Sequence, residues 1–295
     1  MNVLLTGSSG FFGQIVMNRL LYDYDVYSLS RSSSYFNCDL SQSIPFFNFR
    51  FDLVIHAAGK AHCPTKTKDE YKSFFDVNYT GTQNLLKSLE SLDQLPKSFV
   101  FISSVAVYGR EVGTNISENM SLLAQDPYGL SKIQAEQLVE NWCLTNNVVC
   151  TILRLPLLLG QNPPGNLGSM LKAIKSGYYF NIGGGRAKKS MVLAEDVARF
   201  IPIIALVGGT YNLTDGEHPC FADLSSAIAK KEMNNLPLVI AKIMGCVGDV
   251  LGEKSPINSN KIKKITSDLT FDDMKARELG WNPQSVLEYL ESNNL

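Results

Sequence analysis

The sequence has few histidines, no excess of charge of one sign and no dense run of basic residues. Its 295 residues include three histidines, and 27 lysines and arginines stand against 28 carboxylates. This balance supplies no strong field for nucleic acid or an anionic membrane, so nucleic acid is excluded as a partner. The cysteines show no paired metal-ligand spacing. We expect no metal, and reduced, mostly buried thiols at Cys38, Cys63, Cys143, Cys150, Cys220 and Cys246.

Long hydrophobic runs are also missing. Phe200 to Val207 is far shorter than the ~20 residues that span a bilayer, and Leu236 to Leu251 is interrupted by Lys242 and Asp249. We therefore expect two core helices and no membrane span, with an interfacial helix as the alternative for the second run. Asn2 to Thr6 already has the pattern of a buried strand, which leaves no room for a leader and predicts a cytoplasmic protein.

Short apolar runs alternate with longer segments of helical period in the first half of the chain. This pattern is typical of a parallel sheet covered by helices on both faces. We therefore predict an α/β fold with a Rossmann-type doubly wound sheet. The expected strands are Asn2 to Thr6, Val26 to Ser30, Asp52 to Ala57, Phe99 to Ser103 and Val148 to Arg154.

Glycine and proline become frequent after about residue 159, which indicates the start of a smaller second unit. Ser190 to Leu206 has the pattern of a strand followed by a helix, and Thr210 to Leu213 that of another strand. We expect this part to rejoin the sheet. The predicted division is a sheet domain at 1–159, rejoined by about 190–215, and a discontinuous C-terminal lobe at 160–189 and 216–295.

The first strand runs into a glycine-rich turn, Gly7-Ser8-Ser9-Gly10-Phe11-Phe12-Gly13, which opens a helix. Gly7 permits the tight turn, Gly10 lets the backbone approach a pyrophosphate, and Gly13 lets the helix pack on the strand. The free N–H groups of the helix start then point at the anion. We expect the turn to bind a dinucleotide through Gly7, Ser9, Gly10, Phe11, Phe12 and Gly13.

The spacing Gly-x-x-Gly-x-x-Gly resembles that of the short-chain dehydrogenase superfamily, and the resemblance covers essentially the whole chain. It implies that Asp39-Leu40 meets the adenine and that Asn78 is the family's structural asparagine beside the cofactor. It also implies that a strand ends beside the cofactor at Ala57, Ala58 and Gly59. In relatives that act on sugar nucleotides, the segment that resembles Leu153-Arg154-Leu155-Pro156 passes the nicotinamide amide, so Leu155 is a further expected cofactor contact.

Where NAD-binding relatives carry an acidic residue after the second strand, this chain has Ser30 followed by Arg31. An acid would repel a 2′-phosphate, whereas an arginine can pair with it through charge-assisted hydrogen bonds. We therefore favour NADP(H) as the cofactor, with NAD(H) as the alternative, and we expect cofactor contacts from Ser30 and Arg31.

Tyr128-Gly129-Leu130-Ser131-Lys132 opens a predicted helix, which places Tyr128 and Lys132 one turn apart on one face. A phenol has an ordinary pKa of about 10, and an adjacent ammonium lowers it, so the tyrosine becomes a usable acid or base near neutrality. Upstream, a buried strand ends in hydroxyls, and in its resemblance to extended members of the superfamily Ser104 falls on the catalytic hydroxyl position. We predict that Ser104, Tyr128 and Lys132 are catalytic, and that the last two also contact the cofactor.

Further matches to sugar-nucleotide enzymes imply where a nucleotide-sugar substrate would bind. Asn166 resembles their contact to the nucleotide diphosphate, and Lys189 falls where relatives carry an arginine on a substrate phosphate. Lysine supplies the charge but not the bidentate fork of arginine. The predicted substrate contacts are Ser104, Val105, Asn166 and Lys189, with help from Lys263 or Lys264.

The resemblance leaves several reactions open. Sugar dehydratases place an Asp-Glu pair directly after the catalytic hydroxyl, but this chain has Val105 and Ala106 there, which disfavours dehydration. Ser30-Arg31 favours reduction of the 4-keto group of a UDP-2-acetamido-2,6-dideoxyhexos-4-ulose, a step toward UDP-N-acetylquinovosamine or N-acetylfucosamine for surface polysaccharides. The alternatives are a UDP-hexose 4-epimerase with tightly bound NAD and, from another class, a dinucleotide-sensing regulator without turnover. Since relatives often dimerise through two helices, a homodimer is also considered.

Overall fold

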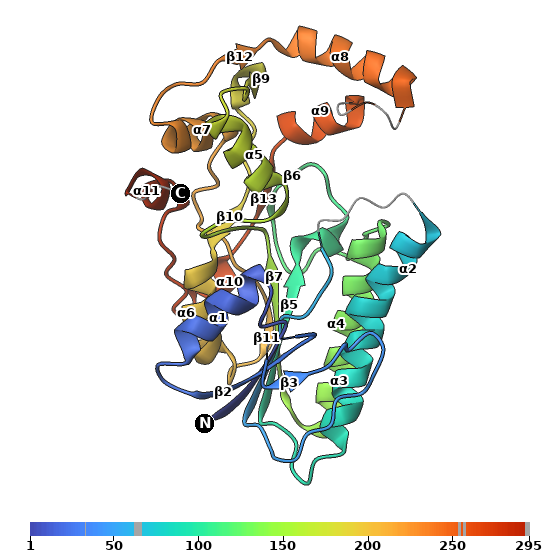
Figure 1. The fold of residues 1–295 in the computed structure, drawn as a ribbon. Coiled ribbons are helices and arrows are strands. Elements are labelled where there is room, and N and C mark those ends of the chain that lie inside the picture. Colours follow the sequence, from blue (N-terminus) through green and yellow to red (C-terminus); the bar gives the residue numbers. More distant parts are fainter. Residues whose placement is uncertain (33, 62–66, 253–254, 256–257, 293–295) are drawn as a thin grey trace.

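A seven-stranded parallel sheet forms the centre of the computed structural model, which describes residues 1–32, 34–61, 67–252, 255 and 258–292 (Figure 1). The strand order is β11-β7-β5-β4-β1-β2-β3. From β1 the chain progresses outward to one edge, then returns to β4 and progresses to the other, which is the order of a doubly wound sheet. The strands are β1 (Asn2–Thr6), β2 (Asp25–Ser30), β3 (Phe36–Asn37), β4 (Leu53–His56), β5 (Ser98–Ser104), β7 (Val149–Leu155) and β11 (Gly209–Asn212).

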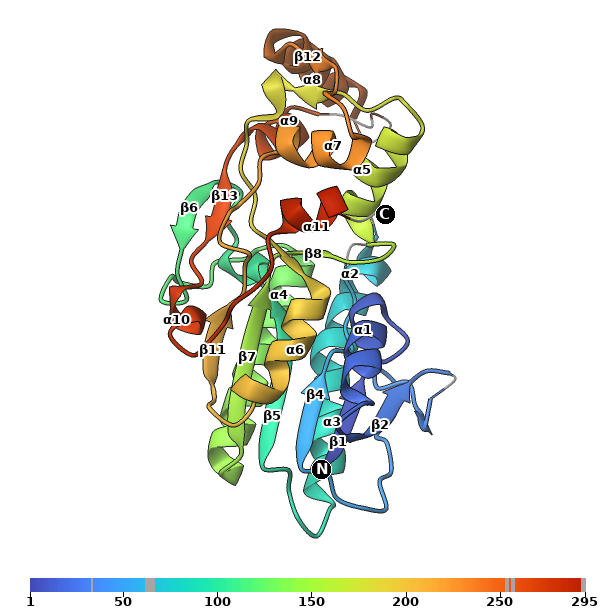
Figure 2. The same ribbon diagram turned by 90° about the vertical axis from the view of Figure 1, so that its left-hand side faces the viewer.

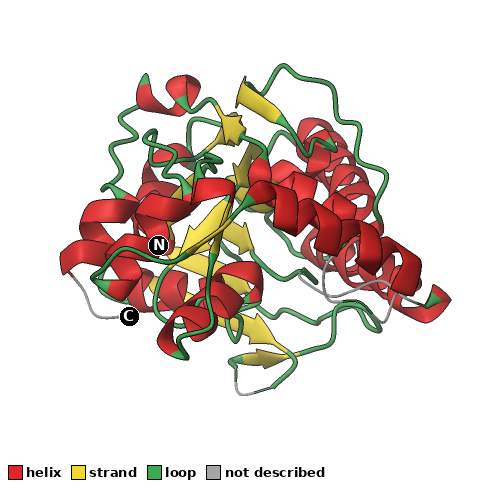
Figure 3. Cartoon of the chain, turned by 90° about the horizontal axis from the view of Figure 1, so that it is seen from above, coloured by secondary structure: helices red, strands yellow, loops and turns green. Residues whose placement is uncertain are grey.

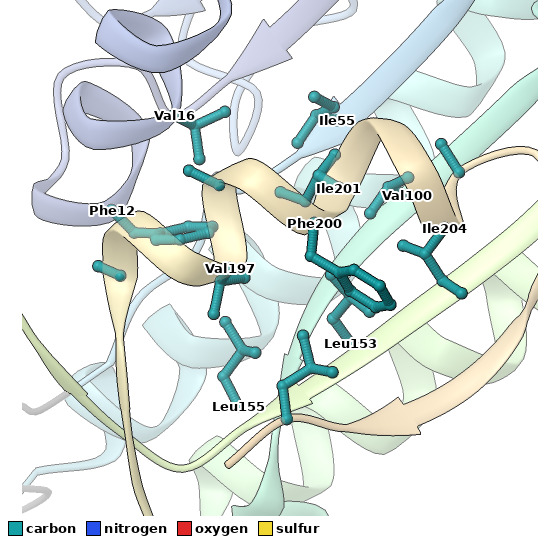
Figure 4. Packing of buried hydrophobic residues seen from close by; sticks show 14 of the residues in the cluster. Phe12, Val16, Ile55, Val100, Leu153, Leu155, Val197, Phe200, Ile201 and Ile204 are labelled. Carbon is teal, nitrogen blue, oxygen red and sulfur yellow. The ribbon is translucent and has the colours of Figure 1, made fainter. Parts of the chain in front are cut away.

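Successive residues of the central strands face opposite layers of helices. In β1, Val3 and Leu5 join the core beneath α1 and α6, whereas Leu4 joins the core beneath α3 and α4. Figure 4 shows the first of these cores, in which Phe200 and Ile201 of α6 lie over the sheet, and Figure 3 shows helices on both sides of it. The predicted fold class is confirmed. The covering helices are α1 (Phe11–Leu20), α2 (Lys68–Phe75), η1 (Asp76–Thr80), α3 (Gly81–Glu90), α4 (Pro127–Asn146) and α6 (Ala194–Ile204).

A smaller lobe lies at the end of the molecule opposite the N-terminus, beyond the carboxyl ends of the strands (Figures 1 and 2). Its apolar core joins α5, α7 and α11 through residues such as Leu167, Leu224 and Leu290. The remaining strands form two-stranded pairs, β10 with β8, β12 with β9 and β13 with β6. These elements and the remaining helices are β6 (Gly113–Ile116), β8 (Leu157–Leu159), β9 (Asn181–Ile182), β10 (Met191–Leu193), β12 (Asn235–Leu236), β13 (Leu269–Phe271), η2 (Val105–Tyr108), η3 (Gly183–Gly185), α5 (Gly165–Lys175), α7 (Phe221–Ala229), α8 (Leu238–Leu251), α9 (Ser259–Thr266), α10 (Met274–Arg277) and α11 (Val286–Ser292).

The segment that returns from the lobe differs in one respect from the expectation. β11 joins the edge of the central sheet beside β7, as predicted, but β10 pairs with β8 outside that sheet. The apolar pattern of Met191–Leu193 predicts a buried strand without identifying its partner. The division of the chain at residues 159, 190 and 215 stays a prediction.

The second apolar run does not form a core helix, so that expectation is wrong. It forms α8, in which Ala241, Gly245 and Gly248 are the buried residues and the large apolar side chains are exposed. The first run begins in α6 and places Phe200, Ile201, Ile204 and Ala205 in the core, as expected, whereas Ile203, Leu206 and Val207 are exposed. None of the described helices has the length and apolar character that a bilayer crossing requires.

The cysteines are less buried than expected. Of the five in the described part of the chain, all free thiols, only Cys143 is buried and Cys246 is exposed. Cys63 lies outside the described residues. The small size of a thiol lets it occupy half-exposed positions without a strong penalty, so composition alone does not predict its burial.

Candidate active site

The glycine turn after β1 is packed tightly against the end of β4. Gly7 has a φ of +73°, and a Cβ on it would lie 2.6 Å from the backbone nitrogen of Ala58. A Cβ on Gly13 would lie 2.1 Å from the Gly7 carbonyl oxygen. Both positions therefore require glycine, because any side chain would collide with backbone that cannot move without opening the turn.

The start of α1 fits the diphosphate of a dinucleotide. Its N-cap residue, Gly10, provides no side-chain hydrogen bond to the first N–H groups of the helix. Ser9 and Gly10 are exposed at this point, whereas Phe12 is buried in the core. Exposed backbone donors behind a glycine turn are the features that hold a pyrophosphate. Individual cofactor contacts stay a prediction for Gly7, Ser9, Gly10, Phe11, Phe12 and Gly13.

Serine hydroxyls build the loop after β2, and Arg31 lies on its outside. Ser30 is buried, and its Oγ donates to the carbonyl oxygen of Ser32 at 2.6 Å. Its hydroxyl therefore supports the loop in this structure. The Arg31 side chain is exposed, so its guanidinium is accessible to a ligand phosphate.

Asp39 and Leu40 lie at the next connection of the chain. The Asp39 carboxylate accepts a hydrogen bond from Ser41 Oγ at 2.7 Å, and Leu40 is buried while its carbonyl oxygen accepts from Asn84 Nδ2 at 2.8 Å. These contacts hold the segment in place beside α3. These hydrogen bonds do not test the predicted contact of Asp39 and Leu40 with the adenine, which stays a prediction.

Asn78 links the segment after β4 to the catalytic helix. Its Nδ2 donates to the Lys60 carbonyl oxygen at 3.1 Å and to Ser131 Oγ at 2.9 Å, and its Oδ1 accepts from the Lys60 N–H at 2.7 Å. The asparagine is buried, so these bonds satisfy an amide that would otherwise be costly to bury. Asn78 thus has the structural arrangement that the sequence implies, next to the predicted cofactor wall of Ala57, Ala58 and Gly59.

His56, the buried histidine at the end of β4, is part of the frame. Its Nδ1 lies 2.6 Å from Thr6 Oγ1 and its Nε2 lies 2.8 Å from Thr82 Oγ1. Burial, together with the charge of Lys132, lowers the pKa of the imidazole to about 3. The ring is therefore neutral near pH 7 and joins β1, β4 and α3 without exchanging protons.

Helix α4, which carries the predicted catalytic residues Tyr128 and Lys132, begins directly before Tyr128. Asp126 caps it, with Oδ1 accepting from the Gly129 N–H at 3.0 Å, and Pro127 occupies the first turn. The phenol of Tyr128 lies close enough to the hydroxyl of Ser104, which ends β5, for the serine to lower the pKa of the phenol. One turn further, Lys132 Nζ donates to the carbonyl oxygen of Ile102 at 2.6 Å. The structure therefore brings the three predicted catalytic residues together at the carboxyl end of β5.

The pKa of Tyr128 differs from the sequence expectation. Burial raises the pKa of the phenol, the hydrogen bond to Ser104 lowers it, and the carboxylate of Asp126 raises it. An ammonium is not among these causes, so the predicted lowering by Lys132 is not the dominant effect here. Tyr128 is consequently held in its neutral, proton-donating form near pH 7.

Lys132 is buried at the base of this group of residues. Its ammonium lies 4.0 Å from the centre of the Phe101 ring, and burial lowers its pKa to about 7 while the charge of Glu136 opposes that change. A lysine with a pKa near neutrality changes its charge readily when a ligand alters its surroundings. The predicted contact of Lys132 with the cofactor stays a prediction.

A buried ion pair behind the catalytic residues was not singled out from the sequence. Arg154 of β7 binds Glu136 of α4 through Nη2 and Oε2 at 2.7 Å, and both side chains are nearly inaccessible. Ser103 donates to the same carboxylate, and Arg154 also reaches the hydroxyl of Tyr108 at 3.2 Å. The sequence did contain one indication of this pair. Glu136 is a carboxyl group one helical turn beyond Lys132, on the same, buried side of the helix.

The predicted substrate contacts lie on different elements. Asn166 is exposed in the first turn of α5, and Val105 is half-buried in η2 directly after Ser104. Lys189 is half-buried, with Nζ donating to the carbonyl oxygens of Lys264 and Ser267 at 2.9 and 2.8 Å. Burial lowers its pKa. Among the described residues no hydrogen bond joins Asn166 or Lys189 to the catalytic group, and their roles stay a prediction, as does that of Leu155 at the buried end of β7.

Comparison with known proteins identifies the family. The model of the NAD dependent epimerase/dehydratase family matches residues 3–213. The chain belongs to this family. Members of the NAD dependent epimerase/dehydratase family are NAD(P)-dependent enzymes of nucleotide sugars, so the resemblance seen in the sequence is confirmed.

Curated relatives cover almost the whole chain. The N-acetyl-alpha-D-glucosaminyl-diphospho-ditrans,octacis-undecaprenol 4-epimerase of Escherichia coli O157:H7 is 28% identical over 303 residues, covering 95% of this chain and 90% of the relative. The UDP-glucose 4-epimerase of Vibrio cholerae is 26% identical over 325 residues, covering 99% and 97%.

Solved structures share the fold. The UDP-glucose 4-epimerase of Thermotoga maritima, determined with UDP-glucose, has a TM-score of 0.75 at 21% identity and covers 99% of this chain and 96% of its own. The protein RMD from Pseudomonas aeruginosa, determined with NADPH, has a TM-score of 0.74 at 20% identity, with 99% and 97% covered. Structures of this fold thus include some determined with NADPH and others determined with NAD.

Proposed function

We propose that this protein is a 4-epimerase of a hexose carried on a diphosphate. The observation that carries the proposal is the placement of Ser104 beside the phenol of Tyr128, with Lys132 one turn along α4. Val105 and Ala106 follow the serine, so the acid that a dehydratase needs directly after its catalytic hydroxyl is missing from the sequence. The chemistry that remains is the exchange of hydrogen at C4.

Each residue has a distinct task in this proposal. A nicotinamide cofactor held here would supply hydride transfer to and from C4, and return of the hydride to the opposite face of the sugar would invert that carbon. In the oxidation half Tyr128 would act as a phenolate and accept the proton of the C4 hydroxyl, and in the reduction half it would return that proton. The bound, cationic cofactor therefore has to lower the phenol pKa that burial raises in the cofactor-free chain, while Ser104 would donate a hydrogen bond to the C4 oxygen. Lys132 orients the ribose next to Tyr128, and the start of α1 holds the diphosphate of the cofactor.

Epimerisation is favoured over net reduction by the relatives. The two curated relatives described above are both named 4-epimerases, and each aligns over most of its own length. They carry the sugar on different groups, undecaprenyl diphosphate in one name and UDP in the other, and a sugar diphosphate is common to both. Reduction of a UDP-4-keto-6-deoxyhexosamine is the second candidate, because Arg31 is exposed where a 2′-phosphate would bind and a reductase must exchange NADPH at each turnover.

The experiment uses purified protein and three kinds of substrate. UDP-N-acetylglucosamine, UDP-glucose and N-acetylglucosaminyl-diphospho-polyprenol in detergent are each incubated without added cofactor, and the C4 configuration is followed by NMR. Conversion of any of them to its 4-epimer is expected. A parallel arm contains UDP-4-keto-6-deoxy-N-acetylhexosamine and NADPH, and stoichiometric loss of NADPH absorbance with no epimerisation would replace the proposal with a 4-reductase. Dinucleotide that binds unconsumed in every arm would indicate a sensor instead.

Replacing Arg31 tests the cofactor preference separately. Arg31→Ala is expected to weaken NADP binding by about tenfold to a hundredfold, the equivalent of one charged hydrogen bond, and to leave NAD binding nearly unchanged. The dissociation constants are measured by isothermal titration. The control is Arg19→Ala. Arg19 lies in the last turn of α1, away from the start of the helix, and pairs with Asp23 on the surface. Equal affinity of wild type and Arg31→Ala for NADP would contradict the assignment.

A further inference from the structure

The exposed helix α8 is packed in an unusual orientation. Its buried positions carry the small residues Ala241, Gly245 and Gly248, whereas its large apolar side chains face outward. Val250 is 88% exposed and Ile243 is 60% exposed. A helix of a globular protein ordinarily buries its largest apolar residues. In α8 the packing against the protein uses the small side of the helix and leaves the large apolar side uncovered.

The small residues explain how α8 is held. A Cβ on Gly245 would lie 2.6 Å from Cδ1 of Ile262 and 3.2 Å from the backbone of Ser259, both in α9. The glycine therefore lets the two helices approach closely, and Asp249 Oδ1 accepts the N–H of Ser259 at 3.0 Å. These contacts anchor α8 firmly on α9, so the orientation of its outer side is determined by packing.

The outer residues form one continuous surface, which we call the α8 ridge. Their spacing of three and four positions places them on one side of the helix. The helix lies across the far end of the lobe, where Figures 1 and 2 show it at the outermost point of the chain. The ridge consists of Val239, Ile240, Ile243, Met244, Val247, Val250 and Leu251, all exposed.

Positive charge accompanies the ridge. From residue 238 to residue 266 the sequence contains five lysines against one aspartate and one glutamate, whereas the whole chain has a net charge of −1. Lys242 of α8 and Lys263 of α9 are exposed, whereas Lys264 pairs with Glu111 at 2.9 Å and adds no free charge. A local excess of lysine beside an apolar helix surface matches the chemistry of an anionic bilayer, whose headgroups attract the ammonium groups while apolar side chains enter the interface.

We propose that the α8 ridge docks this enzyme on the surface of an anionic lipid membrane. A second copy of the chain is a poorer occupant, because two ridges in contact would bring their lysines together. The near-neutral total charge of the chain does not oppose docking. Salt screens the electric field of the membrane within about 10 Å, so only residues close to the bilayer interact with it. The proposal goes beyond the proposed function and does not depend on it.

Vesicle sedimentation tests the proposal without any measurement of turnover. Vesicles of phosphatidylglycerol and phosphatidylcholine in equal parts are compared with phosphatidylcholine alone, at low and high salt. We expect the wild type to bind the anionic vesicles, and the double variant Ile243→Ser/Val247→Ser to bind at least about tenfold more weakly because it loses two apolar anchors. Lys242→Glu/Lys263→Glu is expected to weaken binding at low salt and to have less effect at high salt.

The matched control replaces two exposed apolar residues far from the ridge. Leu144→Ser/Ile203→Ser removes side chains that are 81% and 59% exposed on α4 and α6, and it should bind vesicles like the wild type. Circular dichroism melting confirms that the variants fold. Failure of the wild type to bind anionic vesicles overturns the proposal, as does unchanged binding by the ridge variant. A wild-type dimer that the ridge variant dissociates, with no vesicle binding, would identify a second copy as the occupant.

Discussion

The variant Tyr128→Phe is expected to lose about 10²–10⁴-fold in kcat and to keep nearly the wild-type affinity for dinucleotide. The substitution removes only the phenolic hydroxyl, which lies beside Ser104. The ring stays where it packs, with its centre 6.1 Å from that of Phe74. Initial rates of C4 epimerisation and titration of the cofactor measure the two quantities.

A matched control removes a different bonded phenol. Tyr211 lies on β11 and its hydroxyl donates to the Gly208 carbonyl oxygen at 2.6 Å, at the edge of the sheet. Tyr211→Phe should cost about 1 kcal/mol of stability and leave kcat unchanged. A wild-type kcat in Tyr128→Phe would show that the proton of the sugar oxygen moves by another path.

The variant Arg154→Met is expected to lower the free energy of unfolding by about 3–5 kcal/mol. It leaves Glu136 buried without its cationic partner, and both side chains of the pair are less than a tenth exposed. The double variant Arg154→Met/Glu136→Met should recover most of the loss, because it removes both charges and fills the space with apolar atoms. Urea denaturation of the three proteins measures these differences.

A surface pair provides the comparison. Arg19 binds Asp23 at 2.8 Å, but both side chains are largely exposed, so Arg19→Met should cost between about 0 and 1 kcal/mol. If Arg154→Met costs no more than Arg19→Met, the buried pair does not support the catalytic helix. If the double variant is as unstable as the single one, packing and not the lost charge partner is the cause.

Local patterns predicted the sheet and the glycine turn well. The apolar centres of two predicted strands, Val3 to Leu5 and Phe99 to Phe101, are fully buried with successive residues on opposite faces of the sheet, so each of these residues carries the same apolar signal. The turn was predictable because Gly7 and Gly13 each meet backbone atoms that no side chain could accommodate. Tyr128 and Lys132 were found together because a helix sets their distance whatever surrounds it.

Features that depend on distant parts of the chain were not predictable in the same way. The pairing of Glu136 with Arg154 joins a helix to a strand, and neither residue reveals its partner in the sequence. The pKa of Tyr128 is set mainly by burial, which spacing does not report. The orientation of α8 was missed because hydrophobic content measures how apolar a helix is, whereas Gly245 and its neighbours decide which side is packed.

The amide of Asn78 has a consequence for how the enzyme can move. It bonds to Lys60 on one side and to Ser131, between the two catalytic residues of α4, on the other. Ser131 Oγ in turn donates to the carbonyl oxygen of Tyr128 at 2.8 Å. One buried amide therefore ties the predicted wall of the dinucleotide site to the helix that carries the predicted catalytic residues, and the two cannot shift apart without breaking these hydrogen bonds.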